Sequence, residues 1–257
     1  MTPAKIWTAY YTMIRAEFVR IIRIWSQTLL PPVVTTTLYF IVFGAFIGSQ
    51  IAPISGFSYM QFIVPGLIMM SVLTSAYMNT VSTFYFAKWT KTVEEILVSP
   101  TPNWVIILGY VSGGVLRGLI VGLLVLVVSL FFTHLVIFNA FVLVAALILT
   151  SVLFSLGGLI NAVFAKSFDA ISIVPTFVLT PLTYLGGVFY SVDALPEFWR
   201  TVSHANPILY MVNAFRYGFL GISDINLYTC FGVLIGFTLL FLSIVIYLFK
   251  KGLGLKN

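Results

Sequence analysis

The fold is decided by a long stretch without a single charged side chain, residues 24–87, which reads IWSQTLLPPVVTTTLYFIVFGAFIGSQIAPISGFSYMQFIVPGLIMMSVLTSAYMNTVSTFYFA. A membrane-spanning helix needs about 20 consecutive apolar residues, and a barrel strand needs about ten that alternate with polar ones. The stretch does not alternate, so it predicts helices. It is too long for one helix, and the turn-forming segments at 48–50 and 53–56 divide it into two spans, about 24–48 and 58–83.

The rest of the chain has the same charge-poor composition. Of its 257 residues, 60% are hydrophobic and 8% are Asp, Glu, Lys or Arg, whereas a soluble domain carries about 25% charged residues. So few charges could not cover a surface in water, and disorder requires low hydrophobicity with high charge. The composition therefore excludes a soluble globular domain and a disordered chain.

Four further apolar runs complete a prediction of an all-α membrane protein with six transmembrane helices. The additional spans are about 103–132, 138–163, 170–190 and 226–249, and the boundary between the first two is weak, marked by Thr133-His134 and Asn139. The transmembrane domain is thus expected over 24–249. Residues 1–23 precede it, and a basic tail, 250–257, follows it.

Basic residues predict the orientation of these spans, because Lys and Arg are concentrated in cytoplasmic segments. Two basic residues, Arg200 and Arg216, fall on one side of the predicted topology, and Arg117 falls inside a span. The other side holds Lys5, Arg15, Arg20, Arg23, Lys88, Lys91, Lys166, Lys250, Lys251 and Lys256. Both termini are therefore expected in the cytoplasm. The net charge of +6 is an orientation signal and does not indicate a nucleic-acid partner.

Residues 1–23 have the pattern of an amphipathic helix that lies in the membrane interface. Lys5, Arg20 and Arg23 fall on one arc, with Arg15 at its edge. The opposite arc of about 120° carries Trp7, Tyr10, Ile14, Phe18, Ile21, Ile22 and Trp25. Two interpretations stay open: a lever that joins a soluble partner to the first span, or a passive anchor.

A second amphipathic helix is expected between the second and third spans, over about 85–98. Its polar face would carry Lys88, Lys91 and Glu95, and Lys91 could meet Glu94 and Glu95 one turn later. Its other face would carry Phe86, Trp89, Val93, Ile96 and Leu97. The pattern fits either a solvated helix end or a docking helix for a cytoplasmic partner.

The segment 191–224 is expected to form two short helices on the outer side, broken at Asn206-Pro207 and ended by Gly221. Its aromatic composition favours helices that dip into the outer leaflet, with Arg200 and Arg216 near the lipid headgroups.

Arg117 is the one charged side chain predicted near mid-membrane, where it needs polar surroundings. No Asp or Glu lies in a predicted span. Its partner is therefore expected to be a carbonyl freed near Pro65, Pro175 or Pro181, or a wet cavity. Its role is either structural or contact with a transported substrate.

The spacing Gly114, Gly118, Gly122 predicts close helix packing, either within the chain or between two copies, and Gly44/Gly48 and Gly232/Gly236 repeat it once each.

The chain lacks the residue patterns of an energy-converting enzyme. It has no Gly-x-x-x-x-Gly-Lys-Ser/Thr loop for a nucleotide and no His-Glu-x-x-His zinc motif. Cys230 stands alone, and His134 and His204 are far apart, so no metal site is expected. No carboxylate in a span could relay protons. These absences predict a non-enzymatic chain that takes its energy from another subunit.

Three segments resemble the permease subunits of ABC-2-type exporters. They are Phe57–Gly66 (FSYMQFIVPG), Val93–Pro100 (VEEILVSP) and Pro181–Tyr190 (PLTYLGGVFY). The third is followed by Leu195-Pro196, Trp199, Asn206-Pro207, Tyr210 and Arg216, a pattern similar to the family's signature before its last span.

The resemblance implies a half-transporter in the bacterial inner (plasma) membrane. Two copies would form the substrate pathway in the bilayer, and soluble ABC ATPase subunits would carry ATP and Mg. Residues around Lys91, Glu94 and Glu95 would contact the ATPase, with a smaller contact at Lys166 and Asp169. Residues 1–23 would be the interface helix.

The resemblance also implies an outer re-entrant pair over 196–220, with Pro196, Trp199, Asn206, Pro207 and Arg216. The pathway hypothesis includes Arg117, Tyr39 and Tyr184, the aromatic residues having an equal claim to face lipid. Two other classes of function remain open: a stand-alone channel or ion-coupled carrier, and a membrane scaffold protein.

Overall fold

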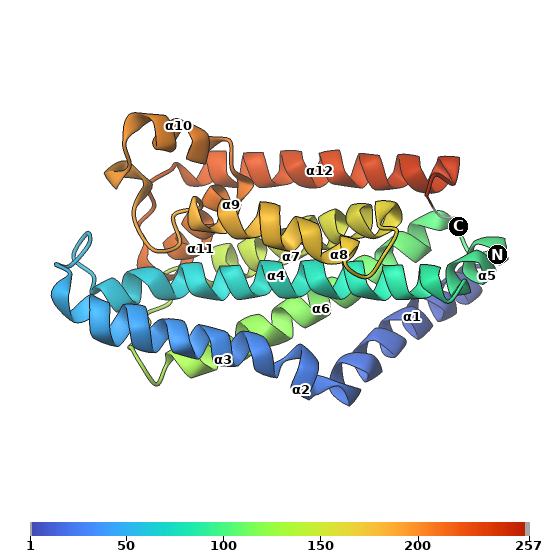
Figure 1. Ribbon diagram of the computed structural model, residues 1–257, viewed down its shortest axis with the longest axis horizontal. Helices are drawn as coiled ribbons and strands as arrows, with labels where there is room; N and C mark the ends of the chain where they lie inside the picture. Colours follow the sequence, from blue (N-terminus) through green and yellow to red (C-terminus); the bar gives the residue numbers. More distant parts are fainter. Residues whose placement is uncertain (1, 255–257) are drawn as a thin grey trace.

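The computed structural model describes residues 2–254 and places them in an elongated bundle of helices (Figure 1). Within these residues the only strand-like pairing is an isolated bridge between Ile54 and Phe57. The all-α prediction is confirmed. Lys256 and the rest of 255–257 lie outside the described residues.

Five helical segments are long and apolar enough to cross a membrane. They are Trp25–Gln50, α4 (Tyr59–Trp89), α6 (Asn103–Ser129), α7 (Ala140–Phe164) and α12 (Leu227–Lys251). The first consists of α2 (Trp25–Thr28), α3 (Leu30–Tyr39), a π-helix η1 (Phe40–Ile47) and a 3₁₀ turn η2 (Gly48–Gln50). Five of the predicted spans are thus confirmed as long apolar helices.

The remaining predicted span, 170–190, is shorter than expected. It consists of α8 (Ala170–Val174), a π-helix η3 (Pro175–Leu179) and α9 (Thr180–Tyr184). This is about 22 Å at 1.5 Å per residue, less than the hydrocarbon thickness of about 30 Å. The expected continuation to Tyr190 is wrong, because the chain turns at Gly186-Gly187, where Gly187 has φ +70°.

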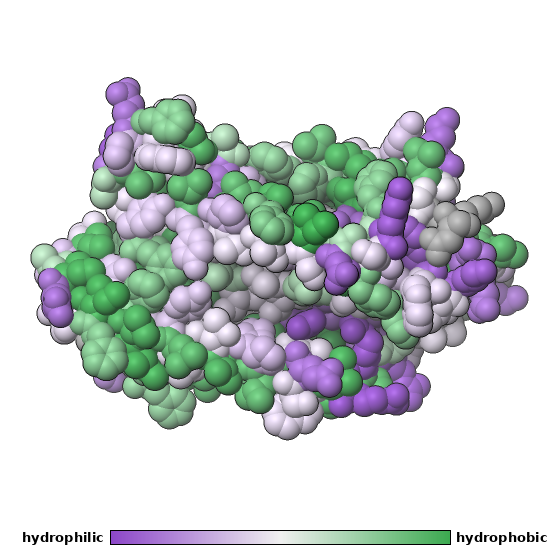
Figure 2. Space-filling view, in the orientation of Figure 1, coloured by the Kyte–Doolittle hydropathy of each residue, from purple (hydrophilic) through white to green (hydrophobic). Residues whose placement is uncertain are grey.

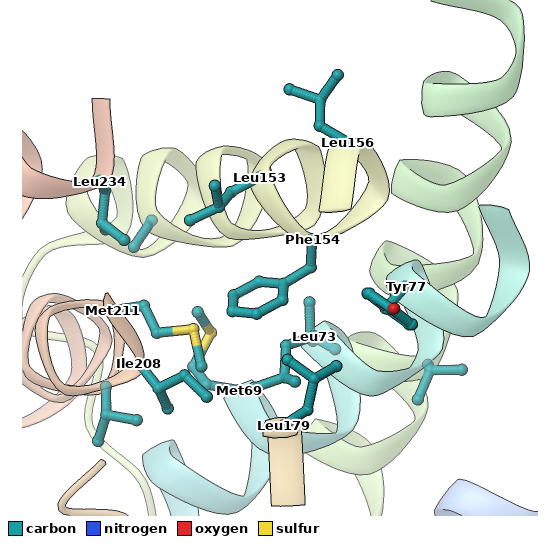
Figure 3. Packing of buried hydrophobic residues seen from close by; sticks show 14 of the residues in the cluster. Met69, Leu73, Tyr77, Leu153, Phe154, Leu156, Leu179, Ile208, Met211 and Leu234 are labelled. Atoms are coloured by element: carbon teal, nitrogen blue, oxygen red, sulfur yellow. The ribbon is translucent and has the colours of Figure 1, made fainter. Parts of the chain in front are cut away.

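The central element is α4, which contacts α6, α7 and α11 (Pro207–Leu220) along its length. Ser58 and Gln61 form a reciprocal capping box that fixes its start. Its middle is apolar on most sides, so neighbouring helices bury it. Figure 3 shows Phe154 of α7 pointing toward Met69 and Leu73 of α4, with Met211 of α11 beside them.

Small residues permit this close packing. A methyl group at Gly114 would overlap Ser155 Oγ and Thr80 Oγ1 and would lie 2.9 Å from the backbone oxygen of Ala76, so α6, α4 and α7 meet there. Gly118 and Gly122 meet the same two neighbours, and Gly44 and Gly48 lie against Met60 and Tyr59. The packing role predicted for these glycines is confirmed. Gly232 and Gly236 of α12 have nothing within 4 Å.

Helix α1 (Pro3–Arg23) packs against α6, with Met13 over Gly109 and Glu17 over Gly113. The predicted apolar arc is therefore divided between two faces. Ile21 is buried and Tyr10 half-buried, whereas Trp7, Phe18, Ile22 and Trp25 are exposed. Part of the predicted arc thus serves helix packing, and the rest forms an apolar stripe on the outside.

The last elements lie at the two ends of the bundle. Helix α5 (Thr92–Val98) is at the end where α1 begins and α12 finishes, and the opposite end holds η4 (Val192–Ala194), α10 (Glu197–His204) and α11 (Figure 1).

Gly114→Ala tests the packing at the centre of the bundle. The added methyl group cannot fit between Ser155 and Thr80, so we expect a loss of about 1–3 kcal/mol in stability, the range for overpacking. Gly236→Ala is the matched control, because its methyl group would meet nothing in the chain. Thermal unfolding of the detergent-purified variants, followed by size exclusion, measures both. Equal melting temperatures for the two variants would contradict this packing.

Candidate functional site

A groove opens on the side of the bundle between α3 and α4. Its volume is about 480 Å³, and it extends from the junction of α1 and α2 to the end of α3. It is lined by Arg20, Ile24, Gln27, Thr28, Pro31, Pro32, Thr35, Thr36, Tyr39, Met70, Ser71, Thr74, Ser75, Met78, Ser82 and Arg117. Ligand-binding pockets typically have volumes of about 300–1,000 Å³, so the groove is large enough to hold a small molecule.

The floor of the groove is the one open face of α4. Met70, Thr74, Met78 and Ser82 follow one another at four-residue spacing, which places them in one row along the helix. All four line the groove, and Thr74 is exposed in the middle of an otherwise buried stretch. Alternation of thioether and hydroxyl side chains makes this floor partly apolar and partly hydrogen-bonding.

Arg117 lies at the α1–α2 end of the groove and bonds to a backbone carbonyl. Its Nη2 donates to the carbonyl oxygen of Thr28 at 2.9 Å. In a continuous helix that oxygen would accept from the N–H of residue 32, and Pro32 has none. The expectation of a proline-freed carbonyl is right, but Pro65, Pro175 and Pro181 are not the source.

The Arg117 charge is not matched by an acid. Among residues 2–254 no ion pair involves Arg117, and its Nε is buried without a partner. A charged Arg in the middle of a membrane helix costs at least roughly 2.5–3.5 kcal/mol. One carbonyl bond uses only one of the five N–H donors of a guanidinium.

A polar triad beside Arg117 was not anticipated from the sequence. Glu17 Oε2 accepts from Arg20 Nη2 at 2.8 Å and from Asn79 Nδ2 at 3.0 Å, and Arg20 Nη2 also donates to Asn79 Oδ1 at 2.7 Å. Glu17 is buried against Gly113. The sequence did contain a signal, because Glu17 lies three residues before Arg20, a spacing that permits an ion pair on a helix. That helix was interpreted only by its apolar and basic arcs.

The two predicted pathway tyrosines meet at the other end of the groove. Tyr39 lines it, and its ring lies 5.9 Å from that of Phe189. The ring of Tyr184 stacks on that of Phe189, also at 5.9 Å. Arg117 and Tyr39 therefore share one cavity, and Phe189 joins Tyr184 to it.

The predicted helix over 85–98 is wrong as a single element. Helix α4 continues to Trp89, and Lys91 has the left-handed φ of 61°, which separates α4 from α5. The two halves consequently do not share a face. Glu94 is half-buried and Glu95 exposed, and no ion pair joins either of them to Lys91 within the described chain.

Lys88 also departs from the prediction, because it is buried and not on a solvated face. Its Nζ donates to the carbonyl oxygens of Val163 at 2.8 Å and Ala165 at 3.2 Å. These oxygens belong to the end of α7, where the last carbonyls have no partner within the helix. Lys88 therefore ties the end of α4 to the end of α7.

The tie between α4 and α7 brings together the two segments predicted to bind the ATPase, α5 and the turn after α7. Lys166 and Asp169 are exposed in the turn after α7. Between them Phe168 packs edge-on against Tyr85 at 4.9 Å and Trp89 at 5.7 Å. The turn and α5 thus both attach to the last turns of α4.

At the end of the bundle that holds α10 and α11, the predicted helix breaks are confirmed. The break at Asn206 also connects α11 to α9. Pro196 precedes α10, and Pro196 and Trp199 are exposed. Asn206 caps α11, its Oδ1 accepting from Ile208 N at 3.0 Å, and Pro207 takes the first helical position. Asn206 Nδ2 also donates to Leu182 O at 2.6 Å, which holds the start of α11 against α9.

Arg216 lies inside the protein, whereas the sequence suggested a side chain at the lipid headgroups. Its side chain is fully buried, with Nη2 donating to Gly187 O at 2.6 Å and Nη1 lying 3.9 Å from Asp224 Oδ2. The guanidinium carbon is 3.8 Å from the centre of the Phe62 ring. A carbonyl, a carboxylate and an aromatic face together replace water around the charge.

Lys88→Met tests the tie between α4 and α7. The variant keeps the length of the side chain but leaves two buried carbonyls unpaired, which we expect to cost about 1–3 kcal/mol. Lys91→Met is the control, since the exposed Lys91 should change stability by less than about 0.5 kcal/mol. Thermal unfolding and the rate of proteolysis in the turn 165–169 report the effect. Lys88→Met as stable and as resistant as Lys91→Met would argue against the tie.

Comparison with known proteins identifies the bundle. Residues 8–220 match the family described as ABC-2 type transporter. The chain is 58% identical to the inner membrane transport permease YadH of Escherichia coli K12 over 98% of both chains. It is 26% identical to nodulation protein J of Rhizobium leguminosarum bv. viciae, over 77% of this chain and 76% of that protein. All three motif segments lie inside the matched range, so the chain belongs to the ABC-2 type transporter family as a membrane permease.

Proposed function

We propose that this chain is one half of an ATP-driven exporter in the bacterial inner membrane. A second copy completes the pathway, and separate soluble ATPase subunits bind ATP and Mg. Membership of the ABC-2 family supports the ATPase partner, and the relative YadH is itself an inner membrane transport permease. The absence of a P-loop motif from the printed sequence fits a division of labour between subunits.

The observation that carries the proposal is a hydroxyl-rich strip along one side of the bundle. Thr35, Thr74 and Thr180 are exposed on three different elements, α3, α4 and α9. A second, smaller cavity lined by Thr74, Thr176, Thr180 and Thr183 continues the groove toward α9. In Figure 2 this strip is pale between greener surfaces, and purple side chains gather near the α1–α2 junction. The Thr180 and Thr183 hydroxyls donate to Pro175 O and Leu179 O, whereas those of Thr35 and Thr74 make no hydrogen bond within the described residues. Because lipid offers such hydroxyls no partner, this face suits a second copy and a polar path.

The proposed topology has six crossings with both termini in the cytoplasm. Its main support is the course of the α8–α9 segment, which carries the chain back from the α5 end to the α11 end (Figure 1). Helices α10 and α11 then form the outer re-entrant pair, and Pro196, Trp199, Asn206, Pro207 and Arg216 shape the outer gate.

The proposed ATPase contact lies at the opposite end of the bundle. Lys91, Glu94 and Glu95 around α5 make the main contact, and Lys166 and Asp169 make a smaller one. Lys88 and Phe168 fix the turn after α7 to the end of α4, and α5 packs directly against α4. Since α4 also forms the floor of the groove, a push on α5 would move the groove wall directly. Helix α1 acts as the interface helix at the same end.

Replacing Glu94 and Glu95 together with Ala tests the ATPase contact. We expect the permease to fold normally, but its binding to the cognate ABC ATPase and its stimulation of ATP hydrolysis should fall at least tenfold, because the charged contact is lost. Glu197→Ala is the matched control, an exposed glutamate at the other end of the bundle. Co-purification and ATPase assays in nanodiscs measure both. Undiminished stimulation by the double variant would refute the assignment of α5.

Cysteine cross-linking tests the pairing of two copies along the hydroxyl strip. In a Cys230→Ser background, Thr35→Cys should form a covalent dimer in membranes with a short bifunctional thiol reagent, because Thr35 lies on the proposed shared face. Leu239→Cys on α12 is equally open to a reagent, with 57% of its surface exposed, and should remain monomeric. Gel electrophoresis reads the result, and the opposite pattern would place the shared face on α12.

A further inference from the structure

The uncompensated cation in the groove points to the chemistry of what the groove accepts. Two basic side chains line it, Arg20 and Arg117, and no acidic side chain does. The nearest acid, Glu17, is already bonded to Arg20 and Asn79. Arg20, Arg117 and Glu17 therefore leave one net positive charge at this end of the groove.

The guanidinium groups at this site still have free donors. Arg117 donates to Thr28 O through Nη2, and Arg20 donates to Glu17 and Asn79 through Nη2. The Nε atoms of both arginines are buried, whereas their Nη1 atoms are accessible and make no hydrogen bond within residues 2–254. Guanidinium donors pair best with carboxylate or phosphate oxygens, often through two parallel bonds. The unfilled donors at one end of a cavity thus match an anionic group.

The rest of the lining suits the body of an amphiphile. Ile24, Pro31, Met70 and Met78 give apolar contact, and methionine adapts to irregular apolar shapes. Hydroxyls are spread among these groups, and the Ser75 hydroxyl is buried without a hydrogen-bond partner. Tyr39 closes the far end of the cavity beside Phe189. A molecule with an anionic head at Arg117 and a less polar body along α4 would match both the cationic end of the groove and its apolar lining.

We propose that the α3–α4 groove binds a single amphiphile with a phosphate or carboxylate head, held by Arg117 with help from Arg20. This inference rests on the proposed function, because it assumes that the groove is the part of the permease that meets cargo or lipid. The negative head neutralises Arg117, and its oxygens take up the free donors. An inorganic anion lacks the apolar body and should bind much more weakly.

Binding to the purified permease, without any ATPase, tests the inference. Dodecyl phosphate should raise the melting temperature in a saturable way, whereas dodecyltrimethylammonium and inorganic phosphate at the same concentrations should not. Arg117→Gln should weaken dodecyl phosphate binding at least tenfold, because glutamine carries no charge and is too short to present the outer donors of the guanidinium group. Arg117→Lys should bind dodecyl phosphate more tightly than Arg117→Gln but more weakly than the unmodified chain, because lysine keeps the charge and loses the paired donors of the guanidinium group.

Arg15→Gln is the control, an exposed arginine of α1 outside the groove. Size exclusion and the melting temperature without ligand establish that each variant is folded. Equal binding by Arg117→Gln and the unmodified permease, or equal binding of the cationic amphiphile, would overturn the inference.

Competition identifies the source of the amphiphile. If phosphatidylglycerol in nanodiscs abolishes the Arg117-dependent binding of dodecyl phosphate and phosphatidylcholine does not, the site is assigned to bilayer lipid. Failure of phosphatidylglycerol to compete would assign it to a distinct anionic cargo, and both results support an anionic amphiphile site. If the permease binds dodecyl phosphate but does not stimulate an ABC ATPase, the result would count against the proposed exporter function and leave the anionic site intact.

Discussion

The bundle depends on backbone carbonyls that are freed where helices break and then satisfied by buried or half-buried cations. Arg117 takes the carbonyl of Thr28, Lys88 takes those of Val163 and Ala165, and Arg216 takes that of Gly187. In a bilayer an unpaired carbonyl and an unpaired cation are each costly, so pairing them removes two penalties at once. Each pair also joins elements far apart in sequence, which fixes the relative positions of the helices.

These three cation–carbonyl contacts lie at different positions along the bundle and have different roles. Arg216 fixes the end that holds α10 and α11, and Lys88 fixes the end that holds α5. Arg117 lies between them, and it is the only one of the three that lines a large cavity. The two outer ties are buried and serve architecture, whereas the Arg117 site remains open to a ligand. A transporter needs this combination of rigid ends and an accessible middle, because movement at one end must reach the pathway.

Much of the candidate site was predictable from the types of residue alone. Arg117 drew attention because a lone charge in an apolar run needs a partner, and Asn206-Pro207 because few helices continue through that pair. Arg216, Lys88 and Glu17 were misjudged or overlooked, since charged residues near helix ends are normally solvated. Their burial depends on partners from other elements, Phe62, Val163 and Gly113, which no local pattern reveals.

The sequence by itself determined the helical membrane fold, five long apolar helices and most of their boundaries. It could do so because run length, turn residues and caps act within a few positions of one another. Only the tertiary structure decided which face of α4 stays open, which carbonyl Arg117 meets, and that α5 and the turn at 165–169 share one support. Those outcomes come from contacts between residues dozens of positions apart, and a pattern read along one helix contains no information about the helix beside it.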